Sequence, residues 1–303
     1  MARKKKKTAR KPKSVDSTNV EFSDELVDYV FPEESGYNED EAAMYDNSDA
    51  LAGIGAREFP SALWIEPREW QERAKQNDET KTWPDNYRNR FTHQGNSHEC
   101  TCHALAQNME IAWNRQSLTK EFAVWFSPLS VYAEANPRRW GGSYMQKTVG
   151  ICINRGILPS YNGPDGIRTQ ANEFKHTLNE TAGNDNSDNG GGDWVPLSRF
   201  PSGWRETARH FKAAEVINPR SAEEIVCLLL HGIAVSVGRS GHAIPYVQVV
   251  WRGGKLHAKY SDSYKVYRVD SWRMIQSAVG GAYGIASTTV PDDWSKPTGE
   301  DML

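Results

Sequence analysis

Residues 94–105 read Gln-Gly-Asn-Ser-His-Glu-Cys-Thr-Cys-His-Ala-Leu, and this stretch carries the main evidence for the fold. Apolar residues then recur at helical spacing, which predicts a helix that begins at Cys100. A thiol at a helix N-terminus lies near backbone N–H groups and the positive end of the helix dipole, and both favour the thiolate. Gln94, six residues earlier, has an amide that can donate to a developing oxyanion. The stretch therefore predicts a nucleophilic cysteine.

A nucleophilic thiol also needs a base that takes its proton and a group that orients this base. The segment Gly241-His242-Ala243 lies between two β-rich segments, 142 residues after Cys100. An Asp-Ser-Trp segment begins at Asp270, after a further predicted strand. We therefore predict His242 as the base and Asp270 as the residue that orients it.

Five motifs in this order resemble those of the papain-like cysteine peptidases, in particular divergent bacterial and tailed-phage members. The resemblance covers roughly residues 80–290, and the motifs are Gln94 with Cys100, Trp140-Gly141-Gly142-Ser143, Gly241-His242-Ala243, Asp270-Ser271-Trp272 and Gly280-Gly281-Ala282-Tyr283-Gly284. It implies an α+β fold in which a helical lobe and a β-rich lobe flank an active-site cleft.

The resemblance also implies an activity and the roles of several residues. Peptide or protein substrates would be cleaved by a Cys-His-Asp triad, with Gln94 and the Cys100 backbone N–H holding the oxyanion. Gly141 and Gly142 would pair with the substrate backbone, and Trp272 would shield the hydrogen bond between His242 and Asp270. No metal or organic cofactor is expected.

Several positions depart from the family's pattern. Glu99 replaces a small residue before the nucleophile, Thr101 replaces Trp after it, and Asp270 replaces Asn. A carboxylate can still accept from the imidazole and hold His242 as a cation. Ser97 stands where the family has a cysteine, so the neighbouring disulfide cannot form. Together with only four cysteines, this favours a reducing, cytoplasmic location, or a virion if the gene is viral.

Two other interpretations of the cysteine stretch are weaker. Cys102 lies about 200° around the helix from Cys100, on the apolar stripe, so it is expected to be a core residue. His98, Cys100, Cys102 and His103 suggest a metal site, but zinc ligands usually come as two pairs and no second pair exists.

The charge distribution separates an N-terminal tail from the rest of the chain. Residues 1–13 hold eight Lys or Arg and no acid, so the remainder of the 303 residues carries 28 basic and 39 acidic side chains. This excludes a globally basic nucleic-acid binder. No apolar run is long enough to span a membrane, and no apolar segment follows the basic start as in a secretory signal.

Residues 1–55 are predicted to be a flexible tail, because residues 14–56 contain twelve acidic and no basic side chains. The tail could attach to another protein or, through its basic end, to nucleic acid. An alternative function follows: a virion-associated or structural assembly protein built on the same fold, with the tail as its attachment arm.

Residues 56–303 are predicted to form the folded domain, with a helical part at about 98–160 and a β-rich part at about 205–290. A helix is expected at 144–155, with Gly156 as its stop. A second helix should begin at a capping box formed by Ser221 and Glu224. The later strands and turns are expected at 233–237, 244–251, 252–255 (a hairpin turn), 265–269 and 282–287.

Overall fold

The computed structural model describes residues 55–87, 94, 98–116, 125–135, 142–160, 200, 202–239, 241–263 and 266–289. The chain divides into residues 1–30 and 31–303, and all described residues belong to the second unit. The predicted tail therefore lies outside the described residues, except for Gly55.

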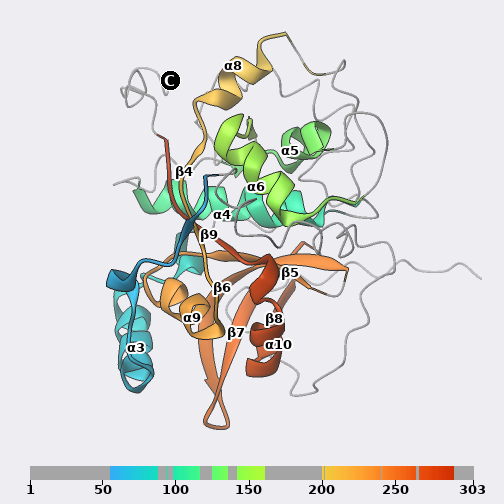
Figure 1. Cartoon of the computed structure of the whole chain (residues 1–303). Coiled ribbons are helices and arrows are strands. Elements are labelled where there is room, and N and C mark those ends of the chain that lie inside the picture. The colour runs from blue at the N-terminus through green and yellow to red at the C-terminus, as the bar shows by residue number, and fades with distance from the viewer. Residues whose placement is uncertain are drawn as a thin grey trace, which may run out of the picture. The chain divides into compact units, whose positions relative to one another are not determined.

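One sheet organises the described part of the chain (Figure 1). Its seven strands, in spatial order, are β1 (Arg57–Glu58), β4 (Ala213–Asn218), β9 (Tyr283–Thr288), β5 (Val235–Arg239), β6 (His242–Arg252), β7 (Lys255–Asp262) and β8 (Val266–Ser271). β1 is parallel to β4, and the other neighbours are antiparallel. A separate two-stranded sheet pairs β2 (Trp125–Phe126) with β3 (Pro159–Ser160).

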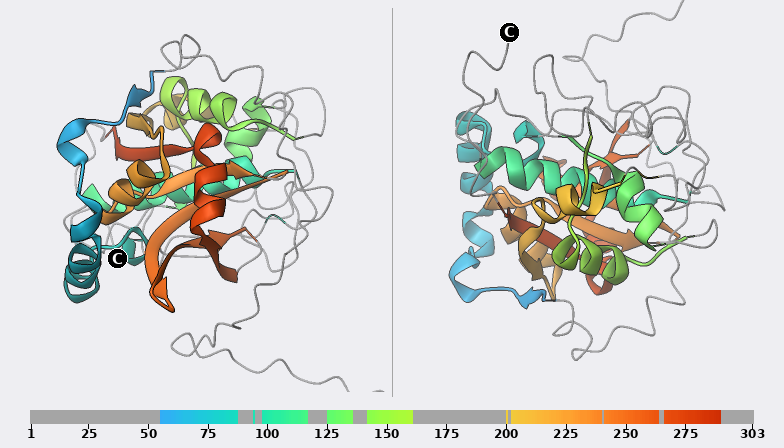
Figure 2. Two further views of the ribbon diagram at one scale, coloured as in Figure 1. Left: turned by 60° about the horizontal axis from the view of Figure 1, so that its bottom comes forward. Right: turned by 90° about the horizontal axis from the view of Figure 1, so that it is seen from above.

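Helix α4 (Cys100–Gln116) begins at the predicted residue and packs against β5, β6 and β9. Helices α5 (Pro128–Ala135) and α6 (Met145–Asn154) cover the side of α4 that faces away from the sheet (Figures 1 and 2). Every residue from Cys100 to Trp113 is buried, as expected for a helix enclosed on all sides.

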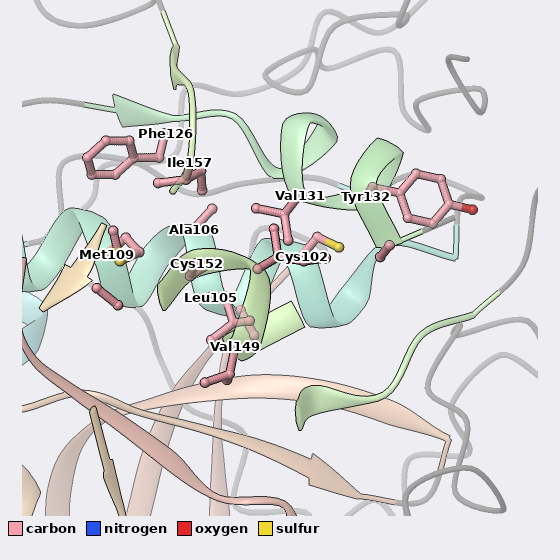
Figure 3. Close-up of a cluster of buried hydrophobic side chains, with 14 of the residues drawn as sticks. Cys102, Leu105, Ala106, Met109, Phe126, Val131, Tyr132, Val149, Cys152 and Ile157 are labelled. Carbon is pink, nitrogen blue, oxygen red and sulfur yellow. The ribbon is translucent and has the colours of Figure 1, made fainter. Parts of the chain in front are cut away.

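The core between these three helices is shown in Figure 3. Cys102 lies in it and is fully buried, which confirms that this thiol is a core residue. Its neighbours in the cluster include Leu105, Ala106, Met109, Phe126, Val131, Tyr132, Val149, Cys152 and Ile157. Burial raises the pKa of the Cys102 thiol well above its usual value, so this side chain behaves as a small hydrophobe.

A second core lies on the other face of the sheet. Side chains alternate along β6: Val247 packs with Ile111 of α4, whereas Ile244 and Tyr246 belong to the second core. This core also holds side chains of α9 (Ala222–Leu230), α3 (Trp70–Thr80) and α10 (Trp272–Ser277). The remaining described helices are η1 (Ser61–Leu63), η2 (Pro67–Glu69), η3 (Pro84–Tyr87), α8 (Trp204–Arg209) and η6 (Val279–Gly281).

The predicted helix ends are confirmed. The Glu224 backbone N–H donates to Ser221 Oγ at 3.2 Å, and the Glu224 carboxylate accepts from the Arg220 N–H at 2.6 Å. Gly156 follows α6 with a φ of +83°, and a Cβ there would lie 1.9 Å from the Ala208 carbonyl oxygen. Glycine is therefore required at this stop.

The α+β class is confirmed, and the hairpin turn at 252–255 joins β6 to β7. Sequence patterns did not predict α3, α5, β4 or β7, and the omission of β7 affects which carboxylate is expected near His242. No helix in the described ranges is long and apolar enough to cross a membrane.

Candidate active site

Cys100 is the first residue of α4, and its thiol is fully buried. Burial raises the pKa of this thiol to about 12, although hydrogen bonds from the backbone N–H groups of Ala243, Thr101 and Cys100 itself lower it. Burial thus outweighs the stabilisation that the helix N-terminus was expected to give the thiolate. The thiol is protonated at neutral pH, so an attacking thiolate requires a base nearby.

His242 is the histidine next in sequence to the residue whose backbone contacts this thiol. It is the first residue of β6 and is fully buried, and the next residue, Ala243, donates its backbone N–H to the Cys100 sulfur. His242 Nε2 lies 3.1 Å from Asp262 Oδ1. When Nε2–H donates to this carboxylate, Nδ1 is the ring nitrogen that can accept a proton.

Asp262 reaches His242 because of the hairpin. β6 and β7 are antiparallel, so the first residues of β6 lie beside the last residues of β7. Asp262 is the last residue of β7, and its carboxylate is fully buried. Its second oxygen, Oδ2, lies 3.6 Å from Arg268 Nε.

The predicted role of Asp270 is corrected by this geometry. Asp270 Oδ2 accepts hydrogen bonds from Arg239 Nη1 at 2.5 Å and from the Tyr246 hydroxyl at 2.7 Å. Asp270 pairs with Ala258 on the far side of β7, away from the strand end that reaches His242. The carboxylate that contacts the His242 ring is therefore that of Asp262, and not that of Asp270.

A sequence signal for Asp262 did exist. Asp262 is followed by Ser263 and Tyr264, the same Asp-Ser-aromatic pattern as at Asp270. In addition, Leu256, Ala258, Tyr260 and Asp262 recur at a period of two, which is typical of one face of a strand.

Trp272 does not shield the histidine. It begins α10, where its ring centroid lies 6.1 Å from that of Trp70. It also lines a surface pocket with Trp251. Trp251 is nine residues beyond His242 on β6, which corresponds to about 30 Å along an extended strand. The shielding role expected for Trp272 is therefore wrong.

Gln94 is held at the site by the residue after Asp262. Its backbone N–H donates to the Ser263 carbonyl at 2.9 Å, and its Oε1 accepts from the Ser263 hydroxyl. Because Oε1 is engaged in this way, the NH2 end of the buried amide is the end that can donate to a substrate oxygen. The structure thus brings the sequence-predicted Gln94 next to the strand end that carries Asp262.

The predicted glycine pair is only partly described. Gly142 is half-buried and precedes the buried Ser143, whereas Gly141 lies outside the described residues. The pairing of this segment with a substrate backbone stays a prediction.

Two buried polar side chains, those of Glu99 and His103, lie close to Cys100 in the sequence. Glu99 Oε2 lies 3.4 Å from His103 Nε2, one helical turn later, and both side chains are 1% exposed. Within the described ranges, no three His, Cys, Asp or Glu side chains gather in a group that could hold a metal ion.

Comparisons with known proteins give matches only among solved structures. No family model and no curated protein matches the sequence. Xylellain, a cysteine protease from Xylella fastidiosa, is 14% identical with a TM-score of 0.46, over 66% of this chain and 83% of that one. Procathepsin B S9 from Trypanosoma congolense is 10% identical with a TM-score of 0.44, over 80% and 89%. Digestive procathepsin L 3 of Tenebrio molitor is 10% identical with a TM-score of 0.46, over 67% of each chain.

The matched structures are a cysteine protease and two procathepsins, in agreement with the resemblance to papain-like cysteine peptidases that the sequence motifs indicated. The overall similarities are low.

Proposed function

We propose that the protein is a thiol hydrolase, most simply a cysteine peptidase, with Cys100, His242 and Asp262 as its catalytic triad. One arrangement carries the proposal. The Cys100 sulfur accepts a hydrogen bond from the backbone N–H of Ala243, and the preceding residue, His242, has its Nε2 3.1 Å from Asp262 Oδ1. A thiol, an imidazole and a carboxylate in this order are the groups that nucleophilic catalysis by cysteine requires.

The reaction would begin with proton transfer. His242 Nδ1 takes the thiol proton of Cys100, and the thiolate attacks the carbonyl carbon of the substrate. Gln94 and the backbone N–H of Cys100 donate to the resulting oxyanion. The imidazolium then protonates the leaving amine, and a water activated by His242 hydrolyses the thioester. Asp262 keeps the ring oriented and stabilises its charged form throughout.

The nucleophile can be identified by covalent labelling. The full-length chain is treated with a thiol-reactive peptide electrophile, and the modified residue is located by peptide mass. We expect the adduct on Cys100, its loss in Cys100→Ala, and nearly unchanged labelling in the matched variant Cys102→Ala. Labelling that survives Cys100→Ala and disappears in Cys102→Ala would overturn the assignment.

The role of His242 can be tested through the pH dependence of the same thiol. In His242→Ala the proton acceptor is gone, so alkylation at neutral pH should fall by about 10²-fold. The rate should then rise only as the pH approaches the thiol pKa of about 12. Equal rates in the two proteins at neutral pH would exclude His242 as the base.

The N-terminal tail is the basis of a second, compatible proposal. We infer from its segregated charge that residues 1–55 attach the enzyme to another macromolecule. A truncated chain that starts at residue 56 should still be labelled at Cys100 but lose this attachment. Unchanged assembly of the truncated chain would refute the attachment role.

A further inference from the structure

The carboxylate of Asp262 lies between the imidazole of His242 and the guanidinium of Arg268. His242 Nε2 faces Oδ1 at 3.1 Å, and Arg268 Nε faces Oδ2 at 3.6 Å. Asp262 is fully buried, whereas the Arg268 side chain is 31% exposed. The arginine therefore approaches from the solvent side and the histidine from the active site.

Strand pairing places Arg268 at this position. Arg268 of β8 is directly opposite Tyr260 of β7, and Asp262 follows Tyr260 by two residues on the same face. β8 is the last strand of the seven-stranded sheet, with β7 as its neighbour. This edge position lets the guanidinium contact both solvent and the inner carboxylate.

The charges around Asp262 explain why a countercharge matters. Cys100 faces it from α4, His242 from β6, Tyr260 from its own strand, and Asp270 and Arg268 from β8. The negative charge of Asp262 contributes to the raised pKa of the Cys100 thiol, which disfavours the thiolate. A buried carboxylate also carries a large desolvation cost unless it is paired.

We propose that Arg268 is a positioning residue of the active site, which acts through Asp262. Its guanidinium holds the carboxylate in the orientation that bonds His242, and its positive charge offsets the negative charge that Asp262 presents to the Cys100 thiolate. The inference rests on the proposed function of Cys100 and His242. A neutral amide at position 262 would need no such partner, so the need for Arg268 depends on Asp262 being a carboxylate.

The experiment measures the alkylation of Cys100 by iodoacetamide, a small neutral reagent, in the full-length chain. Rates are recorded from about pH 4 to about pH 11, because the thiolate is the reacting form. The variants are Arg268→Gln, Arg268→Lys, Asp262→Asn and the double variant Asp262→Asn/Arg268→Gln. Arg273→Gln removes an exposed arginine of α10 and serves as the matched control.

Removal of the Arg268 charge should move the rise in reactivity to higher pH by about one unit, because an uncompensated buried charge then opposes the thiolate. Arg268→Lys keeps the charge and should restore most of the profile, and Arg273→Gln should leave it unchanged. In the Asp262→Asn background, loss of Arg268 should shift the profile by less than about 0.3 unit. A merely structural arginine would not show this dependence on the charge of residue 262.

The outcomes separate the two proposals. An equal shift from Arg268→Gln in both backgrounds, or no shift in either, overturns the role of Arg268 and leaves the triad intact. If Arg268→Gln fails to fold, the comparison of Arg268→Lys with wild type decides, and a profile displaced by as much as one unit overturns the charge argument. If wild-type Cys100 shows no reactivity near neutral pH, the proposed function fails, and this inference fails with it.

Discussion

Two short segments of this protein have the same sequence pattern and different surroundings. Asp262 is the last residue of β7 and is followed by Ser263, whereas Asp270 and Ser271 are the last two residues of β8. Both carboxylates are buried, and each contacts an arginine: Arg268 at Asp262 and Arg239 at Asp270. The Asp262 carboxylate bonds His242, whereas the Asp270 carboxylate bonds the Tyr246 hydroxyl.

The difference shows that strand position, and not local sequence, decides what a buried carboxylate does. The last residue of β7 lies beside the first residues of β6, where the imidazole is. The corresponding residue of β8 is one strand further away and opposite Ala258. Asp262 is therefore the carboxylate of the proposed catalytic triad, whereas Asp270 holds Arg239 and Tyr246 within the sheet.

The largest expected effect is on catalysis. Asp262→Ala should lower kcat/KM by roughly 10³-fold, within the range for loss of a group that controls a general base. Asp270→Asn should change it by less than about threefold, because this carboxylate does not touch the imidazole. Steady-state hydrolysis of a peptide substrate measures both, and the reverse order of effects would return the orienting role to Asp270.

The next effect is on stability. Asp270→Ala leaves the Arg239 guanidinium, only 4% exposed, without its carboxylate partner. Loss of one member of a buried ion pair should lower the free energy of unfolding by about 3–5 kcal/mol. Urea unfolding measures this change. The double variant Arg239→Met/Asp270→Ala is the control and should recover part of the loss; a single-variant cost below about 1 kcal/mol would contradict the pairing.

A smaller effect is expected at Tyr246. Tyr246→Phe removes a hydroxyl that donates to Asp270 at 2.7 Å but keeps the ring that fills the second core. The free energy of unfolding should fall by about 1.5 kcal/mol, the range for a hydrogen bond to a charged group. Urea unfolding of this variant beside Asp270→Ala shows whether the two changes act on one network, because their effects should then be less than additive.

The smallest effect is expected at Trp272. Trp272→Phe keeps an aromatic ring near Trp70 and should cost about 1 kcal/mol of stability. Trp272 lies far from His242 along the sheet, so kcat/KM should change by less than about twofold. A tenfold loss of activity without a change in KM would place Trp272 back at the active site.

Sequence patterns predicted a large part of this arrangement. Apolar periodicity and cap residues located α4, α6 and α9. Motif order predicted Gln94, Cys100 and His242 as site residues. β7 was missed because His257, Lys259 and Ser261 interrupt its apolar residues, so its sequence is less apolar than that of β5 or β6. The partner of His242 could not be chosen without β7, since the choice depends on pairing between residues twenty positions apart.

The turn between β6 and β7 has a consequence for protein engineering. Gly253 and Gly254 have positive φ, and a Cβ on either would meet nothing within 4 Å. Residues inserted at this tip extend into open space and leave the pairing between the two strands unchanged. Deletion of a single residue within β7 would instead turn the Asp262 side chain to the other face of the sheet. A peptide tag at the tip should therefore leave His242 and Asp262 as neighbours, while the number of residues between them in the linear sequence can change freely.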